Sequence, residues 1–256
     1  MKIQKLSKRT YLLVILVLLL PVLFIIYSPV IMAVGVLNGM ITLSAIVFAV
    51  WFISSFFLGR AASCGYTCPY GALQEICGDK VLNKKASKRK ADYMRYFIFL
   101  AFLTVAAYSI LNLGKIQGLD LFTSPGASNL RGAGGLQLAV LIPLSIIIIG
   151  TLSLMFGSRA FCRYLCPQGV FLTIGAKLGN KLKIQRLNLT SNQKNCSKCD
   201  ICNKACPMGI EVSQMVLANS MENANCILCG ECAEACPRDV INYSLDKEHN
   251  IKKSRR

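Results

Sequence analysis

The stretch Cys196–Pro207 reads CSKCDICNKACP, and the stretch Cys226–Pro237 reads CILCGECAEACP, with the same cysteine spacing. In each stretch three closely spaced cysteines are followed by a fourth cysteine and a proline. Three closely spaced thiolates can hold one [4Fe–4S] cluster in a short loop, and the fourth, carried away on a helix, reaches the other cluster. The predicted ligands of cluster one are Cys196, Cys199, Cys202 and Cys236, and those of cluster two are Cys226, Cys229, Cys232 and Cys206.

The 13 cysteines of the chain have two other possible interpretations, disulfides and zinc. A secreted disulfide framework rarely places four cysteines within a few residues twice over, each time before a proline. Zinc also accepts four thiolates, but its usual paired CxxC spacing differs from this run. The pattern therefore favours iron–sulfur clusters in a reducing compartment. Cys77 lies outside every motif and has no assigned role, because a single buried cysteine usually packs as a small hydrophobe.

The region 190–245 resembles a bacterial two-cluster ferredoxin. The resemblance implies an α+β domain of two βαβ-like halves, with Val240–Leu245 as a closing strand. It also implies that the two clusters lie close enough for rapid electron exchange. A basic tail, 246–256, follows this domain.

The N-terminal part contains three long stretches without a charged residue: 10–59, 96–114 and 132–158. A helix needs about 20 residues to cross a bilayer, so the first stretch has room for two crossings and each of the others for one. We expect a membrane all-α four-helix core in a domain 1–189, with spans at about 11–28, 37–58, 96–114 and 136–157. A cleaved signal peptide is the alternative for the first span, but Ala33, the only suitable cleavage residue, lies inside continuing apolar sequence.

Basic residues gather at the ends of these apolar stretches. The chain has 29 Lys and Arg against 12 acidic residues, and Lys84, Lys85, Lys88, Arg89 and Lys90 lie between spans two and three. The positive-inside rule places such segments in the cytoplasm. We therefore expect a multi-pass inner-membrane protein whose two termini and ferredoxin domain are cytoplasmic. Because no groove-reading motif accompanies the basic residues, we expect no nucleic-acid partner.

A second repeat follows the second and the fourth predicted spans. Residues 64–71 read CGYTCPYG and residues 162–169 read CRYLCPQG, so five of eight positions are identical. Each copy follows an even-numbered span and an arginine, Arg60 or Arg159, which predicts a two-fold duplicated transmembrane hairpin. Cysteines at Cys-x3-Cys spacing lie one helical turn apart, so two pairs would supply four thiolates. These four, a candidate third metal or redox centre, are Cys64, Cys68, Cys162 and Cys166; the alternative is a structural turn whose cysteines merely pack.

Four spans, two CxxxCP motifs and two C-terminal cluster motifs in this order resemble the NapH and MauN family of ferredoxin-type membrane proteins, whose core recurs in NosR-type and CcoG-type proteins. The resemblance implies an electron-transfer subunit of a quinol dehydrogenase. Quinol would be its diffusible substrate. Its partner would be an iron–sulfur or cytochrome oxidoreductase, such as a periplasmic nitrate reductase. The single histidine, His249, lies outside the spans, so no histidine ligand for a transmembrane haem is available.

A quinol site needs polar side chains at the membrane border. Tyr66, Tyr164, Glu75 and Arg60 are candidates because each is near a CxxxCP motif, although Tyr and Arg also favour that depth as simple anchors. Two other functions fit the same motifs. One is a redox-sensing or regulatory membrane protein, and the other is a maturation factor for a respiratory metalloenzyme that handles copper or iron on the CxxxCP thiols.

Overall fold

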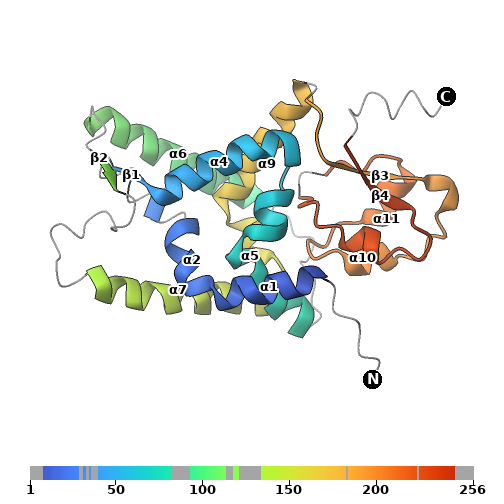
Figure 1. The fold of residues 1–256 in the computed structure, drawn as a ribbon, viewed down its shortest axis with the longest axis horizontal. Helices are drawn as coiled ribbons and strands as arrows, with labels where there is room; N and C mark the ends of the chain where they lie inside the picture. The colour runs from blue at the N-terminus through green and yellow to red at the C-terminus, as the bar shows by residue number, and fades with distance from the viewer. Residues whose placement is uncertain are drawn as a thin grey trace.

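The computed structural model of the chain describes residues 8–28, 31–32, 35, 40–81, 93–113, 118–120, 134–182, 184–223 and 225–245. Figure 1 shows a helical body beside a smaller domain that the C-terminal residues form. The basic cluster predicted at 84–90, Ala33, His249 and the basic tail lie outside the described residues.

The predicted first span, 11–28, corresponds to two helices, α1 (Lys8–Leu18) and α2 (Leu20–Tyr27). Pro21 lies in the first turn of α2. Proline has no backbone N–H and its ring obstructs the preceding turn, so a continuous helix ends here and a new one begins.

The other three predicted spans each contain a helix. These are α4 (Leu43–Leu58), α6 (Met94–Leu113) and α7 (Gly134–Phe156). Two short strands, β1 (Met40–Thr42) and β2 (Gly118–Asp120), pair in parallel beside the beginning of α4. Thr42 caps α4 by accepting a hydrogen bond from the N–H of Ala45 at 3.4 Å.

No single helix in the described ranges is both long enough and apolar enough to cross a membrane. The helix α4 and the π-helix η1 (Ala61–Thr67) together meet both criteria, with a bend of 109° between them. The four-span core stays a prediction.

Each CxxxCP motif lies at a junction of two helices. In the first copy η1 is followed by α5 (Pro69–Glu75) and the π-helix η2 (Ile76–Val81), and in the second α8 (Ala160–Tyr164) is followed by α9 (Pro167–Lys181). The motif proline begins α5 and α9, because proline is favoured in the first turn of a helix. The helix α5 packs against α1, α2 and α7, whereas α9 packs against α4 and α6.

The C-terminal domain has one two-stranded antiparallel sheet in the described residues. Its strands β3 (Asn188–Ser191) and β4 (Ile241–Ser244) pair Leu189 with Tyr243. Between them lie η5 (Gln193–Asn195), α10 (Ile201–Ala205), α11 (Val212–Leu217) and α12 (Glu231–Glu234). β4 lies inside the expected closing strand 240–245, but neither half forms its own βαβ unit, because one strand precedes both motifs and the other follows both.

Candidate functional site

The two ferredoxin-type motifs share an unusual backbone conformation. Left-handed residues recur at equivalent positions of the two copies: Lys198 and Leu228 (φ 56° and 51°), Asp200 and Gly230 (56° and 80°), and Gly209 and Asp239 (62° and 48°). Six of the ten left-handed residues in the described ranges thus lie in these loops, and four of the six carry a side chain that disfavours this conformation. Such strain persists where a loop must wrap around a fixed centre, which is the geometry that a cluster requires.

The loops gather the cysteines into two cavities. One cavity is lined by Cys206, Cys226, Cys229 and Cys232, and the other by Cys196, Cys199, Cys202 and Cys236. These are the two predicted ligand sets, each completed by the fourth cysteine of the other motif.

The surroundings of both cavities suit a sulfur-ligated cluster. The N–H of Leu228 points to Sγ of Cys226 at 3.4 Å, and the N–H of Val240 points to Sγ of Cys236 at 3.5 Å. Hydrogen bonds of this kind stabilise thiolates and tune cluster potentials. Among the described residues no group of three or more Cys, His, Asp or Glu side chains is arranged around one metal ion. A cubane spreads its ligands over four irons, so its cysteines lie farther apart than those of a single ion.

The two cavities differ in what surrounds them. Cys199, at the first, is exposed to solvent. The second faces the helical body, where the Tyr66 hydroxyl donates to the carbonyl oxygen of Cys229 at 3.0 Å. Gly65 packs so closely on this loop that a Cβ atom there would lie 2.8 Å from the carbonyl oxygen of Ile227. The cluster-two cavity is therefore in contact with the first CxxxCP motif.

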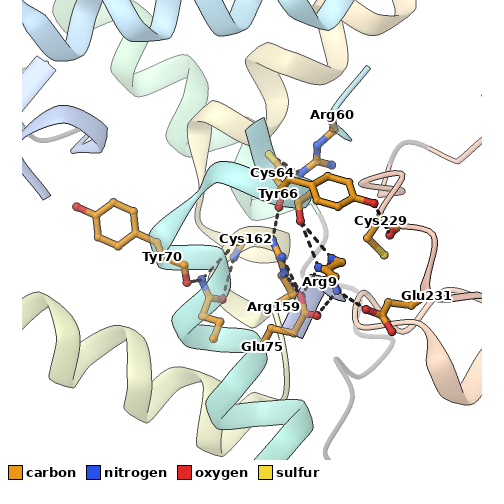
Figure 2. A network of polar contacts seen from close by, with 12 residues as sticks. Arg9, Arg60, Cys64, Tyr66, Tyr70, Glu75, Arg159, Cys162, Cys229 and Glu231 are labelled. Atoms are coloured by element: carbon orange, nitrogen blue, oxygen red, sulfur yellow. Dashed lines mark hydrogen bonds and ion pairs between the residues drawn. The ribbon is translucent and has the colours of Figure 1, made fainter. Parts of the chain in front are cut away.

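The two CxxxCP motifs are brought together by a buried glutamine of α5. Gln74 accepts hydrogen bonds from the N–H groups of Phe161 and Cys162, at 2.9 and 3.3 Å. Its amide nitrogen lies 3.3 Å from Sγ of Cys162. Figure 2 shows Cys64 and Cys162 within one cluster of polar contacts. A helix of the first copy thus holds the second motif in place.

Each copy also sends its arginine to the other copy. Arg159 lies against Gly71, where any Cβ atom would collide with its guanidinium group, and Arg60 lies against Gly169, where a Cβ atom would be 3.1 Å from Nη2. The motif glycine therefore leaves space for the arginine of the opposite copy. This exchange explains why both motifs end in glycine and both follow an arginine.

The four CxxxCP cysteines affect one another electrostatically. Burial raises the pKa of Cys166 well above its ordinary value, and the thiols of Cys162, Cys64 and Cys68 raise that pKa further. Burial, followed by Cys162 and Cys64, raises the pKa of Cys68 to about 12. Arg60 is 3% exposed and its Nη2 lies 3.8 Å from Sγ of Cys64. Arg60 also interacts electrostatically with Cys162 and Cys166. A buried cation beside these thiols suits an anionic sulfur-ligated centre, because it offsets the charge of the thiolates.

A buried ion network joins the N-terminal helix to both sites (Figure 2). Glu75, 1% exposed, accepts from Arg9 and from Arg159, whose Nη2 is 2.8 Å away. Arg9 also reaches Glu231 of the cluster-two loop at 2.7 Å, and Nη1 of Arg159 donates to the carbonyl oxygen of Cys64 at 2.6 Å. Burial alone would raise the pKa of Glu75, but Arg159 and Arg9 outweigh this effect and lower that pKa to about 2.

The four polar residues that we predicted for a quinol site do not lie together around one cavity in the described residues. Tyr66 binds the loop of cluster two, and Glu75 is paired with Arg9 and Arg159. Tyr164 is buried, with the Arg163 guanidinium group 5.8 Å from its ring centre. Arg60 lines a large cavity beside cluster two. Sequence reasoning missed the roles of Arg9, Gln74 and Glu231. Of these three residues only Arg9 could have been singled out from the sequence, because it is the last charged residue before the apolar stretch 10–59.

Comparisons with known proteins identify both parts of the chain. A family profile described as a 4Fe-4S binding domain matches twice, at residues 40–89 and 136–185, and so covers each CxxxCP half. A profile described as a 4Fe-4S dicluster domain matches residues 188–237. No solved structure matches the chain significantly.

Three relatives match this chain at low identity. YccM of Escherichia coli K12, named as a candidate electron transport protein, is 28% identical over 70% of this chain and 50% of its own length. The uncharacterised protein MJ0750 of Methanocaldococcus jannaschii is 30% identical over 61% of this chain and 62% of its own. Protein NirI of Paracoccus denitrificans is 27% identical over 64% of this chain and 24% of its own.

The chain spans between a quarter and three fifths of the length of these relatives. The iron–sulfur interpretation of the cysteine motifs agrees with both profiles. Together the profiles and the relatives support a place for this chain among iron–sulfur electron-transport proteins, with an electron-transfer or redox-related role.

Proposed function

We propose that this protein is a NapH-type inner-membrane subunit that passes electrons between quinol and a partner oxidoreductase. The observation that carries the proposal is the pair of four-cysteine cavities, the second of which lies against Cys64 of the first CxxxCP motif. When bound, the clusters would take up single electrons, so that a quinol QH2 is converted to the quinone Q with release of two protons and two electrons.

The arrangement of the cysteines gives the molecule a direction. Because Cys199 is exposed, cluster one would lie at the surface, where a partner protein could approach. Cluster two would lie inward, because Gly65 and Tyr66 of the first CxxxCP motif pack on its loop. A soluble partner would therefore exchange electrons at cluster one, and the helical body at cluster two.

Exposed apolar side chains on the helical body support a membrane location. Leu18, Val50, Phe97 and Ile147, on α1, α4, α6 and α7, are between 57% and 74% exposed. Large apolar surfaces of this kind mark sites of contact with a membrane or another protein. The basic segments between the apolar stretches favour a cytoplasmic ferredoxin domain.

Quinol should reduce the clusters directly. We expect a short-chain quinol, added to the anaerobically purified full chain, to bleach the visible absorbance of the oxidised clusters. The Cys77→Ala variant, altered outside all the motifs, should bleach equally. Bleaching by dithionite but not by quinol would contradict the quinol role and leave the iron–sulfur role standing.

We also propose that the CxxxCP cysteines hold a further iron–sulfur centre. Gln74 would position Cys162, and Arg60 and Arg159 would offset the negative charge of the thiolates. Replacing Cys64 and Cys162 together by alanine should lower the iron and acid-labile sulfide content while leaving both ferredoxin-type signals in the electron paramagnetic resonance spectrum. Cys77→Ala again serves as the control. Unchanged iron in the double variant, or copper bound by the wild-type thiols, would contradict this centre.

A further inference from the structure

A cavity of about 640 Å³ lies where the helical body meets the ferredoxin-type domain. Its walls come from the end of α4, the C-terminal half of α9, the strand β3 and the loop 218–223. Ligand sites commonly enclose about 300 to 1,000 Å³, so this cavity has room for a small organic molecule. None of the predicted cluster ligands except Cys226 lines it.

The charged side chains of its lining are mainly cationic. Among the described residues, Arg60, Lys177 and Arg186 line the cavity, against a single carboxylate, Glu222. That carboxylate accepts from Asn180 at 2.5 Å and from Arg186 at 3.2 Å.

Hydrogen bonds of Arg186 connect two sides of the cavity. Arg186 also donates to the carbonyl oxygen of Ala176 on α9 at 2.9 Å, so it links this helix to the loop that carries Glu222. The site therefore needs little rearrangement to accept a ligand.

The position of the cavity links it to both groups of cysteines. Cys226 lines both this cavity and the cluster-two cavity, as do Leu189 and Met221, so the two cavities are adjacent. On another wall Arg60 reaches Sγ of Cys64 at 3.8 Å. Gly59 and Arg60 directly follow the predicted second span, 37–58, and so would lie at the border of the membrane, where a lipid-soluble molecule meets the clusters.

We propose that this cavity binds the head group of a quinol, an inference that rests on the proposed function. Loss of a proton from a quinol hydroxyl leaves a negative charge on its oxygen, and the three cationic side chains would stabilise that charge. The apolar stems of the lysine and arginines and the side chains of Leu228 and Met221 would cover the ring.

The test measures binding rather than turnover. The probe is heptyl-hydroxyquinoline N-oxide, a fluorescent quinol analogue that is quenched on binding, titrated into the anaerobically purified full chain. Ala176→Trp fills the cavity and should weaken binding about tenfold or more, and Lys177→Ala should weaken it by about threefold to tenfold. The controls are Ile174→Trp and Lys181→Ala on the same helix, because both residues are exposed and outside the lining.

The outcomes distinguish this proposal from the proposed function. Weaker binding in both cavity variants, unchanged binding in both controls and an unchanged iron content would support the site. Equal binding by Ala176→Trp and the wild type would overturn it, even if quinol still bleached the clusters. If the analogue bound nowhere and quinol bleached nothing, the quinol function itself would fail.

Discussion

Replacing Cys206 by alanine is expected to remove the same cluster as replacing Cys226, although the two cysteines belong to different motifs. The reason is that Cys206 lines the cavity formed by Cys226, Cys229 and Cys232, not the one formed by its own motif. By the same geometry, Cys236→Ala should have the effect of Cys196→Ala. Each variant should lose about four irons and four sulfides per chain.

Iron and sulfide analysis, with electron paramagnetic resonance of the dithionite-reduced full chain, would separate the two classes. The variants at 206 and 226 should lose one signal, and those at 236 and 196 the other. Cys77→Ala should retain both signals. If instead Cys206→Ala matched Cys196→Ala, each motif would hold its own cluster and the crossed assignment would be wrong.

The ligand assignment, which stays a prediction, and the beginnings of two helices could be drawn from the sequence because the information is local. The four-cysteine spacing indicates which sulfurs could share a cluster, and the motif proline indicates where α5 and α9 begin. The pairing of the two CxxxCP copies was also visible, as an eight-residue repeat. Such features depend on neighbouring residues, so they can be interpreted without knowing the fold.

The contacts between distant segments could not be predicted in this way. Gln74 has no motif of its own, and its contact with Cys162 depends on how α5 packs beside α8. Arg9 and Glu231 are 222 positions apart in the chain, yet they form an ion pair. Pro21 was a local signal that the first predicted span forms two helices, but the prediction rested only on the length of the apolar stretch. The cavity beside Cys226 arises only where two domains meet.

The ion network around Glu75 is the second place where a single change should have a large effect. Its carboxylate lies between Arg9 and Arg159, and all three side chains are at most 5% exposed. Glu75→Gln keeps the shape but leaves two buried guanidinium groups without their shared carboxylate. Removing one partner of a buried ion pair costs about 3–5 kcal/mol, because the remaining charge has lost both its counter-ion and its hydration. The loss would also loosen the first CxxxCP motif, since Arg159 holds the carbonyl oxygen of Cys64.

We expect Glu75→Gln to lower the Tm by roughly 6–20 °C, as followed by the fluorescence of Trp51, the only tryptophan. Glu222→Gln is the matched control: the Glu222 side chain is 48% exposed where it pairs with Arg186, so loss of this ion pair should cost about 0–1 kcal/mol.

The effect of Glu75→Gln should also depend on pH. Because the folded-state pKa of Glu75 is lowered from 4.5 to about 2, its contribution is complete above pH 4.5 and is lost as the pH falls from 4.5 towards 2. The difference in Tm between wild type and Glu75→Gln should therefore shrink below pH 4.5. A difference that stayed constant to pH 3, or a variant as stable as Glu222→Gln at neutral pH, would mean that this carboxylate does not hold the two arginines together.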